Sequence, residues 1–252
     1  YDNDDDKNAC ERLLMEFNET EINEIACVSY AYWIISSTKT KDRIPDNAQR
    51  ISVLKEIRRH YVGEGRNFNN ALDAIREALE YRRKYRFNIV RSCFDDDERA
   101  EGNNNNKDDK DDEDDEDLAV KYKRLILDDL ERQPMVVCSS VDDYDRVIVY
   151  KPPRTSSGDG EAFLLTQIYT AERAMATADI RSKGTKERLT VIFNFEDYSR
   201  RNSPPTSIMI TLLKLLQRCY PERLGVIVIA HSPLWLRLIY NILWPLISKA
   251  TK

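Results

Sequence analysis

Glycine, proline, cysteine and histidine are all scarce in this chain of 252 residues, which contains 7, 9, 5 and 2 of them, respectively. So little Gly and Pro excludes a collagen-like or linker-dominated protein. The cysteines are scattered, odd in number and without a C-x-x-C pair, which argues against a disulfide scaffold or a structural zinc site and favours a reducing compartment. Two histidines are too few for a metal centre built on several imidazoles. We therefore expect no metal and no cofactor.

Sequence motifs of common enzymes are also absent. The chain has no P-loop, no G-x-G-x-x-G, no G-x-S-x-G and no H-E-x-x-H. His231 and Ser232 are neighbours in the chain, but a nucleophile needs a base and a third group that orients the base. Cys219 lies in a segment typical of a helix end, which favours a structural thiol. We expect no catalytic residue, and no enzyme.

Charge is distributed unevenly along the chain. The net charge of the whole chain is −5, but residues 95–117 carry −11 and residues 1–8 carry −3. The remaining residues therefore carry +9, which suits an anionic partner such as a membrane surface or a nucleic acid. The alternative is a solvated basic surface that the chain's own acidic segments balance.

Residues 1–94 predict a small helical region. Helical spacing is found over 9–36 and 46–62, with Asp46 or Asn47 as the N-cap of the second segment, and a further helix begins near Asn69 or Asn70. The apolar stripes expected on the last two helices are Ile51, Leu54, Ile57 and Tyr61, and then Leu72, Ile75 and Leu79.

Residues 95–117 are a low-complexity acidic run that cannot bury apolar surface, so we expect a disordered linker. The glycine and closing glutamate of an EF-hand are not in place, which argues against a calcium loop.

Residues 118–252 have the pattern of an α/β domain. Helices are expected over 119–131, 160–180 and 206–218, and strands over 146–150, 189–195 and 224–230. This alternation predicts parallel strands joined by right-handed crossovers. The apolar stretch Leu224–Ile247 resembles a membrane span, but Pro233 and Pro245 interrupt it, so a buried strand followed by an apolar helix over 234–247 is the better interpretation.

The strand over 189–195 is apolar on both faces. The simplest explanation is that helices cover both faces, and the alternative is that the second face meets an apolar ligand.

The segment from Arg218 to Gly225 reads RCYPERLG and is followed by the strand VIVIA and by His231-Ser232-Pro233. This block resembles the most recognisable segment of the CRAL-TRIO lipid-transfer family. Weaker similarities lie at 66–85, at 143–150, where Asp145 replaces a glycine, at 169–174 and at 244–247. The resemblance covers about 50–252.

The resemblance implies a fold and a pocket. The fold class is α/β, with a small N-terminal helical lobe (1–94), an acidic linker (95–117) and a CRAL-TRIO-type α/β lobe (118–252) whose mixed sheet floors a lipid pocket. The resemblance also implies that the gate helix lies beyond residue 252, so that the lobe is incomplete at its C-terminus. The expected pocket lining is Leu189, Val191, Phe193, Phe195, Ile227 and Ile229.

Similarity to the phosphatidylinositol-binding members implies headgroup contacts from Glu222, with Arg223 and Thr251 as further candidates. Members that hold phosphatidylcholine carry hydroxyl residues where this chain has Leu189 and Val191, so we do not expect that ligand. The implied function is to bind phosphatidylinositol or another hydrophobic ligand and to exchange it at an anionic membrane surface. Such a protein would be cytoplasmic, peripherally membrane-associated and without a nucleic-acid partner. The alternative is a lipid-sensing or protein-interaction module of a larger signalling protein.

Overall fold

The computed structural model describes residues 4–37, 47–95, 110–142, 144–182 and 185–232. In the N-terminal part, the described residues form six helices: α1 (Asp4–Leu14), α2 (Glu19–Ala26), α3 (Tyr30–Ser37), α4 (Ala48–Gly63), α5 (Phe68–Lys84) and α6 (Phe87–Ser92). Asn18 caps α2 in a capping box with Glu21, and the side chain of Asn67 caps α5. Leu13, Ile25, Val53, Ile57 and Ile75 form the centre of the core that joins α1, α2, α4 and α5.

The buried side of α4 differs from the predicted stripe. Ile57 is buried as expected, but Ile51 is 48 % exposed, while Val53, Glu56 and His60 are buried. The prediction counted only apolar residues, whereas α4 also turns a carboxylate and an imidazole toward the interior. The helix is therefore rotated relative to the predicted stripe.

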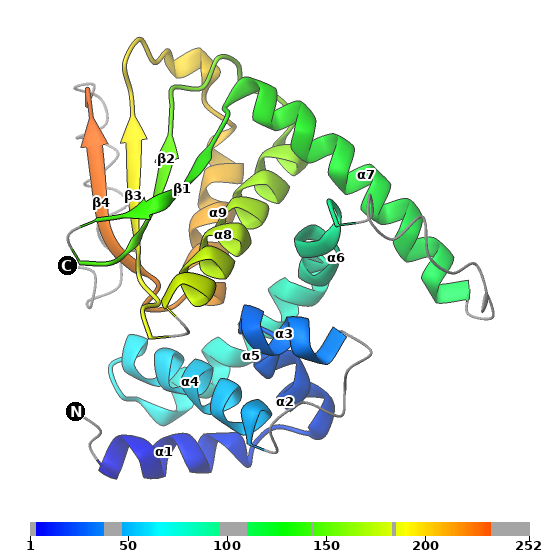
Figure 1. The fold of residues 1–252 in the computed structure, drawn as a ribbon, viewed down its shortest axis with the longest axis vertical. Helices are drawn as coiled ribbons and strands as arrows, with labels where there is room; N and C mark the ends of the chain where they lie inside the picture. The colour runs from blue at the N-terminus through cyan, green and yellow to red at the C-terminus, as the bar shows by residue number, and fades with distance from the viewer. Residues whose placement is uncertain (1–3, 38–46, 96–109, 143, 183–184, 233–252) are drawn as a thin grey trace.

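Helix α7 (Lys110–Arg132) begins inside the segment predicted to be a disordered linker. The prediction is thus wrong for residues 110–117, and residues 96–109 lie outside the described residues. Acidic side chains near a helix N-terminus interact favourably with the helix dipole, so this run is compatible with a helix start. Arg86 also forms an ion pair with Asp115. Figure 1 shows α7 as a long helix whose N-terminal half extends away from the sheet.

Up to residue 232, where the described part of the chain ends, the second part is built on a mixed sheet of four strands in the order β1-β2-β3-β4: β1 (Val136–Val141), β2 (Val147–Lys151), β3 (Leu189–Asn194) and β4 (Leu224–Ala230). β1 pairs antiparallel with β2, and the other neighbours are parallel. Helix α8 (Gly160–Ser182) connects β2 to β3. The 3-10 helix η3 (Arg200–Asn202) and α9 (Thr206–Cys219) connect β3 to β4. The predicted α/β fold class with an N-terminal helical region is confirmed.

Strand β1 was not predicted, since its sequence VVCSSV lacks clear alternation of apolar and polar residues. In Figure 1, β2, β3 and β4 run in the same direction, and the N-terminal helices lie at the end where these strands begin. Within the described residues, no helix combines the length and the apolar character that crossing a bilayer requires. The helix expected over 234–247 lies outside the described residues.

Candidate functional site

The register of the parallel strands defines two faces of the sheet. Val149 of β2 is paired with Val191 of β3, which is paired with Ile227 of β4. Paired residues lie on the same face of a sheet, and their neighbours in each strand point to the opposite face. The second face therefore carries the residues one position further along, which are Tyr150, Ile192 and Val228.

Helix α8 packs on the face of Val149 and Val191. Its residues Ala174, Met175 and Ala178 form a buried cluster with Val147, Val149 and Leu189, and Val191 packs against that cluster. Leu189 is only 6 % exposed. The prediction that Leu189 and Val191 line a pocket is therefore wrong, because both belong to the core beneath α8. A strand that is apolar on both faces leaves open which face the helices cover, and an error of one residue exchanges the two faces.

The other predicted lining residues lie further along β3 and in the middle and carboxyl end of β4. Phe193 is on the α8 face, where the Lys151 ammonium lies 5.3 Å from its ring centroid. Phe195 follows the strand and makes an edge contact with Tyr198. Ile227 and Ile229 share the α8 face but are 44 % and 43 % exposed. Helix α8 covers β1, β2 and β3, which leaves β4 less protected.

The face opposite α8 is apolar in its middle and polar at both ends. Its apolar residues are partly exposed, and they come from three neighbouring strands. They are Ile148, Ile192, Val226 and Val228. We name this set the open sheet face. Thr190 and Asn194 lie on the same face, near the two ends of β3.

At the amino end of the open sheet face, Asp142 organises the turn between β1 and β2. Its carboxylate accepts hydrogen bonds from the Thr190 hydroxyl (2.6 Å) and from the side chain and backbone N–H of Arg146. Burial raises the pKa of Asp142, but these hydrogen bonds outweigh it and hold the pKa far below its usual value. Thr190 is a polar residue of this face that the sequence analysis did not single out.

Glu222 lies in the turn that leads into β4, at the same end of the sheet. Its φ is +58°, and its carboxylate accepts a hydrogen bond from Arg188 at 2.9 Å. The Glu222 side chain is 13 % exposed and that of Arg188 57 %, so the guanidinium faces solvent. The sequence analysis also missed Arg188, which immediately precedes β3.

Arg223 has a different environment from Glu222. It is 5 % exposed, and its guanidinium lies 3.6 Å from the Glu56 carboxylate of α4. Burial raises the pKa of Glu56, but Arg59, Arg223 and His60 lower it more, to about 2. The buried Arg223 therefore joins the N-terminal helices to the sheet. Its assignment as a headgroup residue stays a prediction from the resemblance.

A second buried cluster of charges joins the same two parts. The carboxylate of Glu172 on α8 accepts hydrogen bonds from Arg91 (2.8 Å) and from the Tyr220 hydroxyl (2.8 Å), and Arg82 lies 3.5 Å away. Burial raises the pKa of Glu172, and the two arginines reverse this, so that the carboxylate stays ionised. These contacts fix α5 and α6 against α8.

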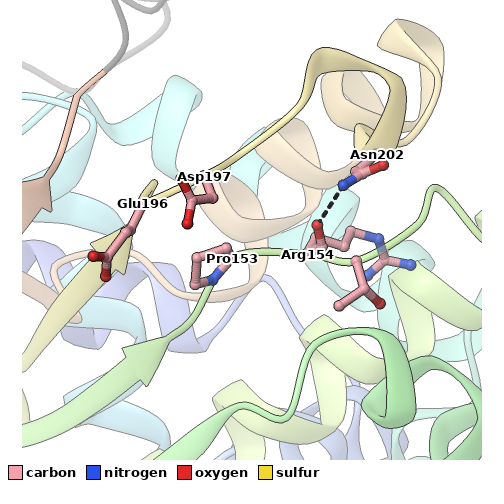
Figure 2. Close-up of a pocket in the computed structure, with 6 residues that line it drawn as sticks. Pro153, Arg154, Glu196, Asp197 and Asn202 are labelled. Atoms are coloured by element: carbon pink, nitrogen blue, oxygen red, sulfur yellow. Dashed lines mark hydrogen bonds between the residues drawn. The ribbon is translucent and has the colours of Figure 1, made fainter.

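Three polar residues meet at the carboxyl end of the open sheet face. Asn194 contacts Tyr150 and His231 through its side-chain amide. Beyond them lies an open cavity of about 420 Å³, lined by Pro153, Arg154, Thr155, Glu196, Asp197 and Asn202. Figure 2 shows the Glu196 and Asp197 carboxylates in this cavity, and Asn202 donating a hydrogen bond to the Arg154 carbonyl.

Three further residues considered from the sequence are Cys219, His231 and Thr251. Cys219 is 1 % exposed, and burial raises the pKa of its thiol to about 12, which fits a structural thiol. The Nδ1 of His231 contacts Asn194. Thr251 lies outside the described residues.

Comparison with known proteins identifies the second part of the chain. Residues 131–252 match the family described as CRAL/TRIO domain, which confirms the family predicted from the YPERLG block. Among solved structures, the chain is similar to the crystal structure of Sfh5, with 14 % sequence identity and a TM-score of 0.58. That match covers 100 % of this chain and 79 % of the Sfh5 chain. No curated protein sequence matches the chain.

Proposed function

Residues 131–252 belong to the CRAL/TRIO domain family, and from this we propose that the chain binds phosphatidylinositol or another hydrophobic ligand and exchanges it at membrane surfaces. The family match is the observation that carries the proposal. The proposed role is non-enzymatic: binding, transport and release of a lipid.

The open sheet face is the wall on which we place the apolar part of the ligand. Val226 and Val228 are 37 % and 42 % exposed, and Ile148 and Ile192 are partly exposed beside them. Burying acyl chains is worth about 0.8 kcal/mol per CH₂, so a lined wall can compete with the bilayer for a lipid. On β2 and β3, the face covered by α8 is already filled with side chains.

We place an anionic headgroup at the amino end of this face. The Arg188 guanidinium is largely exposed there and is oriented by Glu222 at 2.9 Å. A guanidinium binds a phosphate through two parallel hydrogen bonds. The carboxylate of Glu222 can still accept hydrogen bonds that Arg188 does not donate, and these suit the hydroxyls of a sugar-like headgroup. Thr251 remains a candidate for the same headgroup from the sequence resemblance alone.

Docking on an anionic membrane would use the basic excess of the folded parts, at about 1 kcal/mol per Lys or Arg near the surface. A protein that cycles between such a surface and the cytoplasm would be peripherally associated. The same basic charge suits nucleic acid, but an apolar sheet face does not, so the lipid is favoured.

The proposal is tested by transfer of radiolabelled phosphatidylinositol between vesicles. Ile192→Asp places a charge in the middle of the open sheet face and should reduce transfer at least tenfold. The matched control is Ile180→Asp, at a residue of α8 that is 67 % exposed, and it should retain transfer. Equal transfer by both variants would contradict this face as the wall, and no transfer by the unaltered chain would contradict the function.

A further inference from the structure

Tyr150, Asn194 and His231 form a continuous chain of hydrogen bonds across three elements. Tyr150 belongs to β2, Asn194 ends β3, and His231 follows β4 with a φ of +53°. The Asn194 Nδ2 lies 3.1 Å from the Tyr150 hydroxyl, and its Oδ1 lies 3.0 Å from the His231 Nδ1. This chain of hydrogen bonds lies at the carboxyl end of the open sheet face.

The positions of the protons in these hydrogen bonds follow from the Asn194 side chain. Its Oδ1 accepts a hydrogen bond from the backbone N–H of Glu196 at 3.0 Å, which fixes the orientation of the amide. Because Oδ1 can only accept, the Nδ1 of His231 must carry a proton. The Nε2 of the neutral imidazole is then an acceptor.

At the Tyr150 end of this chain of hydrogen bonds, the tyrosine oxygen accepts a hydrogen bond from Nδ2 of Asn194. The hydroxyl proton of Tyr150 therefore remains free to be donated. Within the described part of the chain, neither the Tyr150 O–H nor the His231 Nε2 has a further hydrogen-bond partner. The two ends thus offer one donor and one acceptor. A hydroxyl group is complementary to both, because it accepts one hydrogen bond and donates another.

The charged residues that line the cavity at this end disfavour an anion. Glu196 and Asp197 follow Phe195, line the cavity and are exposed, and the guanidinium of Arg154 in the same lining is already paired with Asp129. The exposed Arg188 lies at the opposite end of the sheet. Thr190 and Asn194 are four residues apart on β3, so about 13 Å of apolar face separates the two ends.

We propose that Tyr150, Asn194 and His231 form a binding site for the hydroxyl group of an uncharged lipid, whose apolar part lies on the open sheet face. This proposal rests on the lipid-binding function proposed above and extends it to a second class of ligand. The amino end of the face suits a phosphate, and the carboxyl end suits a neutral alcohol.

The test compares oleyl alcohol with its methyl ether, which keeps the chain and the acceptor oxygen but lacks the donor proton. Binding of each tritiated probe to the full chain is measured by equilibrium partition from neutral phosphatidylcholine vesicles. The unaltered chain should prefer the alcohol about tenfold, the value of one well-placed hydrogen bond. His231→Phe should reduce this preference to about twofold or less, since it removes the Nε2 acceptor for the ligand proton.

Tyr150→Phe removes the donor and should weaken the alcohol and the ether alike by about tenfold. Tyr144→Phe is the matched control, because Tyr144 is 71 % exposed in the turn before β2. This variant should bind both probes as the unaltered chain does. The thermal midpoint of each variant is measured as well. A loss of stability without any change in alcohol preference would mean that the three residues only fasten β4 to β3, and would overturn the proposal.

Phosphatidylinositol binding separates the two proposals. If the chain binds phosphatidylinositol but binds alcohol and ether equally, the hydroxyl site is refuted and the lipid-binding function stands. If neither phosphatidylinositol nor the alcohol binds, both are refuted.

Discussion

His60 lies within the buried charges that connect α4 to the α/β part. It is 3 % exposed, and its Nε2 is 3.7 Å from the Glu56 carboxylate. Burial lowers the pKa of His60 from 6.5 to about 4; Glu56 opposes this shift, while Arg82, Arg59 and Arg218 add to it. The folded chain therefore keeps this imidazole neutral at pH values where the unfolded chain protonates it.

The consequence is an acid-dependent loss of stability. Between pH 6.5 and pH 4 the unfolded state binds more protons at this residue, so the free energy of unfolding falls as the pH falls. From a folded pKa of about 4 and an unfolded value of 6.5, the expected loss between pH 7 and pH 4.5 is about 2.5 kcal/mol. Glu56 adds to this loss of stability only below about pH 4.5, because its pKa in the folded chain, about 2, lies under its ordinary value of 4.5.

The assay is urea denaturation followed by circular dichroism at intervals from pH 7 to pH 4.5. His60→Gln should flatten the dependence, because glutamine has no proton to gain in this range. An unchanged slope in His60→Gln would refute the reasoning.

Three further comparisons of variants test the turn before β2, the buried ion pair and the two faces of the sheet by chemical denaturation. Asp145 has a φ of +61° at the position where the family carries glycine, so Asp145→Gly should stabilise the chain by about 0.5–1 kcal/mol and Asp145→Ala should not. Arg223→Met should cost about 3 kcal/mol because it leaves Glu56 buried and without that partner, and adding Glu56→Leu should recover part of the loss. Leu189→Ala should cost about 2–4 kcal/mol beneath α8, whereas Ile192→Ala on the open sheet face should cost clearly less; equal costs would contradict the assignment of the two faces.

Much of the fold could be predicted from the sequence because its α/β part has strong local patterns. The strand and helix positions from β2 to β4 follow from apolar periodicity and from the prolines that interrupt it. The apolar residues Ile75 and Leu79 place α5 in the same way, but its N-cap is Asn67, so the helix begins slightly before the predicted Asn69 or Asn70. The start of α7 could not be predicted, since composition alone does not show that an acidic run continues into a helix.

The site was harder to predict than the fold, and the reason is geometric. Both faces of β3 carry apolar residues, so the sequence pattern does not distinguish the two faces. Only the contact of Leu189 with α8 shows which face is covered. The YPERLG block, in contrast, is recognisable partly for structural reasons. Arg223 is a buried ion-pair partner, and a side chain on Gly225 would come within 3.1 Å of the Leu189 carbonyl oxygen. The two charged residues of this block therefore have different environments, because Glu222 is partly buried in a turn and Arg223 belongs to the core.

The most direct test of the lipid-binding function is the identity of the lipid that co-purifies with the full chain, determined by mass spectrometry of organic extracts. The account predicts a stoichiometric phosphoinositide or other hydrophobic ligand, with a bound phosphoinositide lost on Glu222→Ala and retained in the control Glu131→Ala, at an exposed residue of α7. A chain that purifies without lipid and extracts none from vesicles would contradict it.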